Sequence, residues 1–386
     1  MLYAASAHSE DIDTASALNE IIEKCQKRLS GQTPKAGLLF AGIDAEHQAL
    51  LDGINKAWPG IQLIGCTTDG ELSSDIGFQE DSVTLLLIGS DTVDITAGIG
   101  RQVSQDITVA CRQAVKEARS KTQLHPSLCI ANPESLTTSG QEVIRSLNNE
   151  LGDDVPVLGA TAADQLRFKG TYQFYCHEVL SDAIPILLFS GPLVYAFGVA
   201  SGWKPIGKPG QVTRSQATTV QEIDGSPAID FYRKFLGPDA KPSGECPLAI
   251  LNDKDEIQYL RAPAGFSIEA EGDIRYFADV PEGARVQITV ADRDAILNGC
   301  RESLDMAIQR YPEGKSPDVA VFFSCAARKL LLGTQISEEY QIFKEKIDPI
   351  VPMCGFYGYG EIGPIKASSA NAKFHNETFI SLLLGT

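Results

Sequence analysis

The pattern of apolar and polar positions along this chain predicts the same succession of elements three times. Each time, a short apolar run is followed by an amphipathic helical pattern and then by a second apolar run. The predicted strand, helix and strand of each unit are Ala36–Ala41, Ala45–Ala57 and Gln62–Ile64; Ser127–Ala131, Ser139–Leu151 and Val155–Leu158; and Asp318–Ser324, Ser337–Ile347 and a strand ending at Cys354-Gly355. Each unit is typical of a βαβ motif, so parallel strand pairing and a right-handed crossover are expected.

The segments between these units are rich in predicted strands. The predicted strands are Ser82–Ile88, Val93–Ile99, Thr171–Tyr175, Ile184–Phe189, Val194–Val199, Gln211–Ser215, Thr218–Ile223, Leu248–Leu251, Gln258–Arg261, Ile274–Phe277, Arg285–Thr289 and Lys373–Leu384. Ser82–Ile88 is expected to pair with Val93–Ile99, and the uncharged stretch Ala183–Trp203 is expected to form a buried hairpin, because Pro and Gly residues break it.

Three further helices are predicted: Gln105–Ser120, Ala291–Tyr311, and one that ends at Leu236. For the last, Ser226 is the expected N-cap and Pro227 the first helical residue. The pattern predicts an α/β protein of two domains, with mixed sheets built around the βαβ units, two curved sheets in all, and ligand loops at the carboxyl ends of strands. We place the domains at residues 1–224 and 225–386.

Two of the units end in the same loop pattern, G-x-x-x-x-G-E. One copy is Gly65–Glu71, which includes Thr67, and the other is Gly355–Glu361. Glycine-rich loops let the backbone approach a ligand closely. A phosphate-binding loop needs Lys followed by Ser or Thr after the second glycine, whereas Glu here would repel phosphate. The pattern therefore favours a ligand with an amine or other donor group, or else two tight turns in which the Glu caps a backbone amide.

Composition and charge narrow the possible partners. The chain has 386 residues, 33 basic against 50 acidic side chains, and a net charge of −17, which disfavours nucleic acids and anionic membrane surfaces. The N-terminus has no basic region of the kind that begins a secretory signal. The nine cysteines are scattered and form no C-x-x-C pair, so neither a disulfide framework nor a zinc site is indicated. We expect a cytoplasmic protein with reduced thiols.

Specific motifs resemble the FIST domain family over nearly the whole chain. The tail Cys354–Pro364 together with Phe374–Phe379 is similar to the FIST C-terminal signature, and the loop Gly65–Glu71 and the turn Gly202–Gly207 fit the N-terminal half. The resemblance implies a sensory module that binds small ligands such as amino acids and signals to a partner histidine kinase or cyclase. The segment Phe323–Arg328 resembles a haem-binding subset of the family that senses nitric oxide.

Several side chains near the expected strand ends are candidate ligand contacts. Arg328 and Glu361 are expected to face the same cavity, where they could hold the carboxylate and the amine of an amino acid, with Tyr357 and Tyr359 covering apolar surface. The alternative is that Arg328 and Glu361 pair with each other as a structural salt bridge. Thr67 and Glu71 are the corresponding candidates in the first loop.

Two histidines are candidates for a metal-bound cofactor. His375 on the predicted strand Lys373–Leu384, or His177 near aromatic residues, could be the axial ligand if haem b binds. For His375 the other interpretation is a hydrogen-bonded structural histidine. The absence of C-x-x-C-H excludes covalent c-type haem.

The sequence thus predicts a non-catalytic cytoplasmic sensor for a small ligand. The first alternative is a haem-based nitric oxide sensor, and the second is an enzyme acting on small metabolites. No G-x-S-x-G, H-E-x-x-H or early G-x-G-x-x-G motif supports the enzyme.

Overall fold

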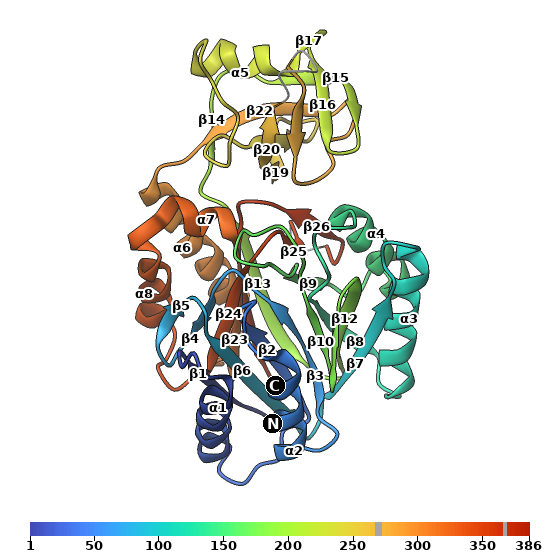
Figure 1. Ribbon diagram of the computed structural model, residues 1–386, viewed down its shortest axis with the longest axis vertical. Helices are drawn as coiled ribbons and strands as arrows, with labels where there is room; N and C mark the ends of the chain where they lie inside the picture. Colours follow the sequence, from blue (N-terminus) through green and yellow to red (C-terminus); the bar gives the residue numbers. More distant parts are fainter. Residues whose placement is uncertain (267–271, 366–368) are drawn as a thin grey trace.

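The computed structural model describes residues 1–266, 272–365 and 369–386. These residues form four β-sheets and eight α-helices, which confirms the predicted α/β class (Figure 1). Two curved sheets were expected, and four are present. Three mixed sheets make up the body of the molecule, while the fourth, whose strand pairings are antiparallel, lies above them.

The body consists of three tandem repeats of one sequence of elements: strand, helix, strand, helix, strand, a short hairpin and a final strand. The first repeat comprises β1 (Leu2–Ser9), α1 (Thr14–Leu29), β2 (Ala36–Ala41), α2 (His47–Ala57), β3 (Gln62–Thr67), β4 (Glu71–Ser73), β5 (Gly77–Gln79) and β6 (Val83–Ser90). The second comprises β7 (Asp94–Arg101), α3 (Ile107–Ser120), β8 (Pro126–Ala131), α4 (Gly140–Leu151), β9 (Val157–Ala160), β10 (Gln173–Tyr175), β11 (Glu178–Leu180) and β12 (Ala183–Ser190).

The third repeat follows the same order but contains an insertion after its first strand. It comprises β13 (Val194–Ala200), α6 (Arg293–Arg310), β23 (Val319–Cys325), α7 (Ala326–Leu332), a 3₁₀ turn (Gly333–Gln335), α8 (Ser337–Lys346), β24 (Met353–Gly358), β25 (Glu361–Pro364), β26 (Ala372–His375) and β27 (Phe379–Gly385). The insertion, which we call the insert, comprises β14 (Lys204–Pro205), β15 (Gly210–Gln216), β16 (Thr219–Ile223), β17 (Ser226–Pro227), α5 (Ala228–Leu236), β18 (Leu248–Leu251), β19 (Ile257–Arg261), β20 (Pro263–Phe266), β21 (Ile274–Tyr276) and β22 (Arg285–Val290).

Each repeat gives its hairpin to the sheet of another repeat. The sheet orders are β1-β6-β2-β3-β10-β11, β7-β12-β8-β9-β25-β26 and β13-β27-β23-β24-β4-β5. We number these sheets one to three after the repeat that supplies most of their strands. The hairpin of repeat one then completes sheet three, the hairpin of repeat two completes sheet one, and the hairpin of repeat three completes sheet two. In each sheet the βαβ pair is parallel, as predicted, and the exchange joins the three repeats into one ring.

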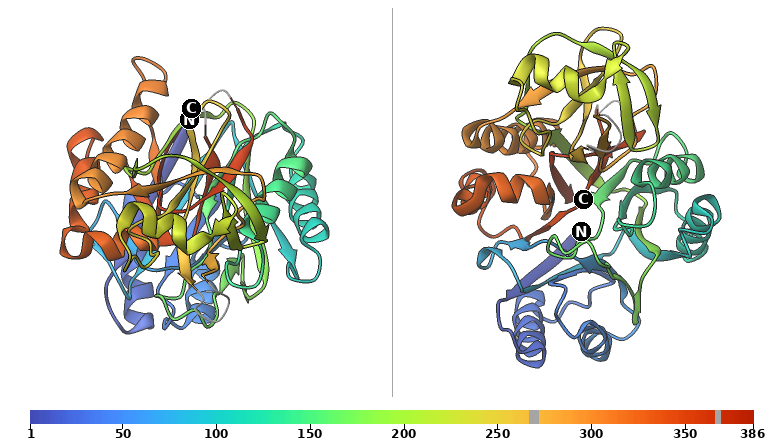
Figure 2. Two further views of the ribbon diagram at one scale, coloured as in Figure 1. Left: turned by 90° about the horizontal axis from the view of Figure 1, so that it is seen from above. Right: turned by 45° about the horizontal axis from the view of Figure 1, so that its top comes forward.

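The inner faces of the three sheets share one apolar core. Phe40, Phe323 and Phe356 meet there, with the rings of Phe40 and Phe356 4.4 Å apart between centroids. The outer faces are covered by the helix pairs α1–α2, α3–α4 and α6–α8, which lie at three corners of the body (Figure 2). Burial on both faces explains why the central strands are almost continuously apolar. Within the described ranges, no helix is long and apolar enough to cross a membrane.

Two expected strand pairs are wrong. β6 and β7 belong to different sheets, and so do β12 and β13, although a short turn joins each pair. The physical reason is that β6 and β12 are buried on both faces and already have a neighbour on each side. The turns therefore pass the chain from one repeat to the next instead of closing a hairpin.

Three local expectations also differ from the structure. The predicted strand Lys373–Leu384 is two strands, β26 and β27, separated by a turn in which Glu377 has a φ of 61°. Ser226 does not cap α5, because it pairs within β17 and Pro227 occupies the N-cap position. The strand β1 and the helix α1 were not predicted from the sequence. The domain division at residue 224 remains a prediction.

The glycine that begins each loop pattern is required by close packing between parallel strands. A Cβ on Gly65 would lie 1.8 Å from the carbonyl oxygen of Leu39, and one on Gly355 would lie 2.5 Å from that of Phe322. Gly159 occupies the corresponding place in repeat two, 2.0 Å from the oxygen of Ala131. The contacted atoms belong to the backbone, so they have little freedom to move aside.

Gly65→Ala should therefore destabilise the protein by about 1–3 kcal/mol or more, as overpacking does in buried sites. The free energy of unfolding from urea titration measures the effect. Gly170→Ala is the control, because a Cβ on Gly170 meets no atom within 4 Å. Equal stabilities for the two variants would contradict the packing explanation.

Candidate functional site

The loops that follow the second parallel strand of each repeat meet at one end of the body. The backbone N–H of Asp69 donates to the carbonyl of Tyr357 at 2.8 Å, and that of Ala163 donates to Thr67 at 2.8 Å. These bonds connect all three repeats at the carboxyl ends of their parallel strands. The predicted ligand loops therefore do lie at one edge, directly below the insert (Figure 1).

Strand register places three side chains at one equivalent position of the ring. Glu71 lies opposite Phe356 of β24, Glu361 lies opposite Ala160 of β9, and Gln173 lies opposite Cys66 of β3. All three are buried. The two Glu loops of the sequence are thus two of three copies. The third carries Gln173 after a longer loop, fourteen residues from Gly159 instead of six, so it does not fit the sequence pattern.

In repeat one, this position is fully satisfied by its neighbours. The carboxyl group of Glu71 accepts hydrogen bonds from the hydroxyls of Thr68 and Ser82, one on each oxygen. Burial raises its pKa to about 7, although both hydroxyls oppose the shift. Thr67, the other candidate in this loop, accepts a bond from the N–H of Tyr172 at 3.0 Å and fixes the start of the next strand. Both side chains therefore have hydrogen-bond partners within the protein itself.

In repeat three, the same position leaves one oxygen without a partner. Glu361 Oε2 accepts from the N–H and the hydroxyl of Thr378, at 3.1 and 2.7 Å. Oε1 is buried and has no hydrogen-bond partner in the part of the chain that the structure describes. Burial raises the pKa of Glu361 to about 8, while Thr378 and the weakly donating thiol of Cys325 hold it lower.

A second buried carboxyl lies beside Glu361. Glu377 is fully buried, and among the described residues neither of its oxygens has a hydrogen-bond partner. Burial, and then the neighbouring Glu361, raise its pKa well above the ordinary range. On the insert side, a Cβ on Gly244 would lie 3.1 Å from Glu377 Oε1. We call Cys325, Glu361 and Glu377 the acidic cluster.

Cys325 completes this cluster at the end of β23. Burial and the two carboxyls raise the pKa of its thiol well above 9, although the backbone amides of Glu377 and Ala327 oppose the shift. The residue therefore remains a neutral thiol, which is a poor nucleophile.

Arg328 is placed differently from the prediction. It lies in α7 rather than in a strand-end loop, and its guanidinium forms a fully buried salt bridge with Glu339, with Nη2 and Oε1 2.5 Å apart. Tyr357 donates to the other oxygen of Glu339 at 2.5 Å. The alternative interpretation, a structural salt bridge between Arg328 and Glu361, is therefore wrong, because Arg328 pairs with Glu339 instead. Arg328 still lowers the pKa of both Glu361 and Glu377 through its charge.

The same guanidinium also binds both connections of the insert. Nη1 donates to the carbonyl of Ser201, where the chain leaves the body, at 2.6 Å. Nη2 donates to the carbonyl of Ile296, where the chain has returned in α6, at 2.9 Å. Trp203 covers the arrangement with its indole ring, 6.0 Å from the guanidinium carbon. Arg328 thus clamps the base of the insert.

Tyr359 holds a neighbouring loop and does not line the acidic cluster. Its hydroxyl donates to Asp164, whose carboxylate also accepts three backbone N–H groups of the loop at residues 168–170. Gln165 and Phe168 in this loop have positive φ angles of 57° and 51°, which marks local strain. Phe168 stacks between Tyr359 and Phe277 of the insert, so this loop is a second bridge between body and insert.

The two candidate haem ligands lie apart from each other. His375 is buried, donates from Nε2 to the carbonyl of Gly363 at 2.8 Å, and has its pKa lowered to about 4 by burial. His177 is exposed in the turn between β10 and β11. An axial bond from Nε2 of His375 would require loss of its structural hydrogen bond. These side chains do not form a fitted haem site, and among the described residues no group of three or more His, Cys, Asp and Glu could hold a metal ion.

Two of the important side chains, Glu377 and Glu339, were not identified as site residues from the sequence. Glu377 was assigned to a continuous strand, where nothing distinguished it from an outward-facing residue. Glu339 was one of several acids in an amphipathic helix. A signal was nevertheless present, because Asn376-Glu377 interrupts the apolar alternation before Phe379 and is typical of a turn. Among the described residues, the acidic cluster therefore contains three carboxyl oxygens without a hydrogen-bond partner and no cation in direct contact with them.

Comparisons with known proteins agree with the resemblance seen in the sequence. The FIST N domain matches residues 35–226, and the FIST C domain matches residues 228–364. An uncharacterized protein of Mycobacterium tuberculosis is 23% identical over 370 residues, covering 93% of this chain and 94% of that protein. An uncharacterized protein of Methanocaldococcus jannaschii is 27% identical over 197 residues, which span 48% of this chain and only 37% of the archaeal protein.

Solved structures show weaker similarity. A chorismatase aligns over 99% of this chain and 98% of its own with a TM-score of 0.36 and 8% identity. A cyanuric acid hydrolase from A. caulinodans aligns over 52% of this chain and 72% of its own with a TM-score of 0.27 and 10% identity. At these scores neither similarity carries an argument about this site.

The raised pKa of Glu361 predicts that its burial opposes folding as the pH rises. The folded chain keeps this proton up to about pH 8, whereas the unfolded chain releases it near 4.5. Between these values the folded state binds more protons, so stability falls with rising pH, by at most about 1.4 kcal/mol per pH unit for one group. Glu361→Gln should therefore become more stable relative to the natural protein between pH 5 and pH 8.5.

Urea unfolding at several pH values measures this difference. Glu23→Gln, on the exposed side of α1, is the control and should give the same difference at every pH. A pH-independent difference for Glu361→Gln would show that this carboxyl is ionised in the folded protein.

Proposed function

Since the chain belongs to the FIST family, we propose that it is a non-catalytic sensory receptor whose small ligand binds the acidic cluster. The ligand carries an amine or a similar cationic donor group, and amino acids are the first candidates. The observation that supports this proposal is the set of three buried carboxyl oxygens, on Glu361 and Glu377, that have no hydrogen-bond partner among the described residues. Unpaired buried polar atoms are costly, so a ligand that supplies donors gains the free energy of satisfying them.

Binding of a cation at this position is coupled to proton release. Both carboxyls have raised pKa values in the free protein, so they hold protons near neutral pH. An ammonium group stabilises the ionised form and lowers those pKa values. The ligand therefore replaces a proton, and its affinity increases as the pH rises toward 8.

The insert is the element that reports occupancy in this proposal. Gly244 of the insert lies against Glu377, and Arg328 binds both connections of the insert while responding to the charge of the two carboxyls. A change in that charge alters the clamp, and the resulting shift of the insert is read by a partner histidine kinase or cyclase. Arg328, Tyr357 and Glu339 are positioning residues in this scheme, since none of them contacts the ligand.

The environment of Cys325 gives no support to an enzyme that would use this residue as its nucleophile. A nucleophilic cysteine needs a lowered pKa, whereas the acidic cluster raises that of Cys325.

Glu361→Gln should weaken binding of an amine-bearing ligand at least tenfold, because it removes the charge that pairs with the ammonium group. Amino acids and simple amines are screened by thermal shift, and a compound that stabilises the protein is then titrated by calorimetry. Glu71→Gln is the matched control, because it makes the same change at the equivalent position of repeat one and should leave affinity unchanged. Equal affinities in the two variants would show that the ligand does not bind at the acidic cluster.

Calorimetry in two buffers of different ionisation enthalpy tests the coupled proton release. The apparent binding enthalpy should change with the buffer in the natural protein at pH 7, and less so in Glu361→Gln. An enthalpy independent of the buffer would contradict the proposed exchange of a proton for a cation.

The haem alternative is separated by a visible absorption spectrum before and after haem is added, with and without nitric oxide. We expect no saturable Soret band, because His375 is committed to Gly363 and His177 is exposed. A one-to-one band that shifts with nitric oxide and is lost in His375→Ala or His177→Ala would replace the amine receptor with the gas sensor.

A further inference from the structure

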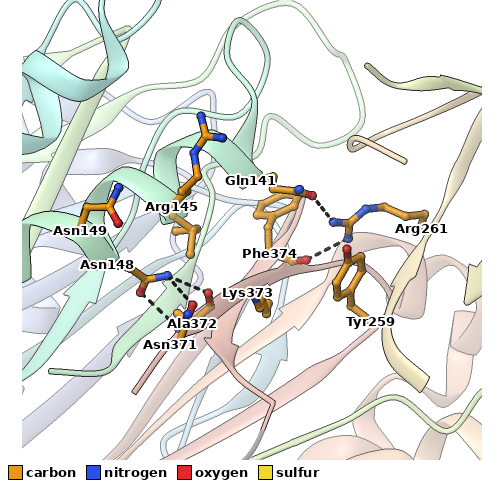
Figure 3. A pocket seen from close by; sticks show the side chains of 11 residues that line it. Gln141, Arg145, Asn148, Asn149, Tyr259, Arg261, Asn371, Ala372, Lys373 and Phe374 are labelled. Atoms are coloured by element: carbon orange, nitrogen blue, oxygen red, sulfur yellow. Dashed lines mark hydrogen bonds between the residues drawn. The ribbon is translucent and has the colours of Figure 1, made fainter. Parts of the chain in front are cut away.

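We propose a second binding site, for a small oxyanion, in the cavity between the insert and repeat two. The cavity has a volume of about 190 Å³ and is bordered by α4, by the strand β26 and by β19 of the insert (Figure 3). Drug-sized ligands occupy pockets of about 300–1,000 Å³, so this cavity suits an inorganic phosphate ion, or a single phosphate or carboxylate group of a small metabolite. Its ligand differs in charge from the cation proposed for the acidic cluster.

Charge is the first observation that supports this site. Three cationic side chains line the cavity, Arg145, Arg261 and Lys373, and no Asp or Glu is among the described residues that line it. In a protein with a net charge of −17, this local excess of positive charge is unusual. A concave site lined by one sign of charge concentrates ions of the opposite sign.

The state of Arg261 is the second observation. Its side chain is 1% exposed, and among the described residues it forms no salt bridge. Its hydrogen bonds go to neutral acceptors: the carbonyls of Asp279, Leu260 and Phe374, and the amide oxygen of Gln141. Burial lowers its pKa to about 10, against the opposing charges of Tyr259 and Asp279. A buried guanidinium without a paired anion is costly unless a ligand supplies one.

The guanidinium of Arg261 has one N–H group left that can donate to a further acceptor. Arginine has five N–H donors, and the four bonds above use one each on four of them. The remaining donor is on Nη2, beside Gln141. The ring of Tyr259 lies 4.1 Å from the guanidinium carbon and holds its plane, and the guanidinium is directed toward Gln141 and Phe374 (Figure 3).

Other charged side chains also lie around Arg261 and the cavity. The carboxylate of Asp279 accepts a hydrogen bond from the hydroxyl of Ser139 at 2.7 Å, so its hydrogen-bond partner is Ser139 and not Arg261. Arg145 is bound by Glu142 on the exposed face of α4, at 3.1 Å. Lys373 is exposed on β26 and has no resolved partner among the described residues. Arg145 and Lys373 therefore supply positive charge at the mouth of the cavity, and Arg261 supplies it at the wall.

The position of the cavity gives the site a consequence for the insert. Arg261 belongs to β19 of the insert, whereas Gln141 and Phe374 belong to the body. An anion bound between Arg261 and the cations of α4 and β26 adds a bridge between the two parts. Occupancy should therefore slow hydrogen exchange in β19 and β26.

Calorimetric titration with inorganic phosphate, in low-salt buffer without other multivalent anions, tests the proposal. We expect saturable one-to-one binding that weakens at least fivefold as ionic strength is raised, because the site is electrostatic. The double substitution Arg145→Ala/Lys373→Ala should abolish saturation or weaken affinity at least tenfold. Both side chains are exposed, so this variant should fold.

The matched control is Arg301→Ala/Lys344→Ala, which removes the same two charge types from exposed positions on α6 and α8. It should retain phosphate affinity within twofold. Equal weakening in both double variants would show that phosphate responds only to the net charge of the protein, which would contradict the proposed site. A titration that never saturates would contradict it as well. Malonate replaces phosphate in a second arm: tighter binding of malonate assigns the site to carboxylates, and tighter binding of phosphate assigns it to phosphate groups.

Two further variants separate this site from the rest of the molecule. Arg261→Lys keeps the charge but loses the fork of donors, so it should weaken the anion at least fivefold while the far-ultraviolet spectrum stays unchanged. Glu361→Gln removes no group that lines the cavity, so saturable phosphate binding should remain in this variant. Loss of anion binding in Glu361→Gln would contradict two separate sites.

Discussion

The exchange of hairpins among the three repeats is the constraint on which the rest of the structure depends. Each sheet is complete only when it receives β4–β5, β10–β11 or β25–β26 from another repeat. Because the hairpin strand starts directly after the loop at the carboxyl end of a parallel strand, the exchange also draws the three loops together. One topological rule therefore forms the common core and creates the edge where Glu71, Gln173 and Glu361 are arranged around the ring.

Equivalent positions in this ring have unequal surroundings, and that inequality locates the candidate site. Glu71 is satisfied by two hydroxyls, and Gln173 is neutral. Only Glu361 keeps a free oxygen among the described residues and has a second buried carboxyl beside it. Burial alone does not separate these residues, since all three are buried. The separating feature is how the hydrogen bonds are distributed: Glu71 accepts one on each oxygen, whereas both bonds to Glu361 are made to Oε2.

The sequence predicted the three βαβ units because their apolar runs and helical periodicity are local and strong. It also identified the loops that contain Glu71 and Glu361. It could not predict the hairpin exchange, since β4 and β5 are only three residues long and their partners lie in a distant repeat. Arg328 was expected at a strand end, but four small residues before it gave no hint that a helix begins at Ala326. Its partner Glu339 is set by tertiary packing, which no local pattern records.

The clamp at the base of the insert affects how this part of the molecule can move. Arg328 holds both connections through charge-assisted hydrogen bonds, each of which contributes roughly 1.5–3 kcal/mol. Both acceptors lie on the body side of the connections, next to β13 and within α6, so the clamp fixes the two points from which the insert extends. A displacement of the insert is therefore confined to bending of the short segments beyond these points, on the microsecond-to-millisecond scale of collective domain motions.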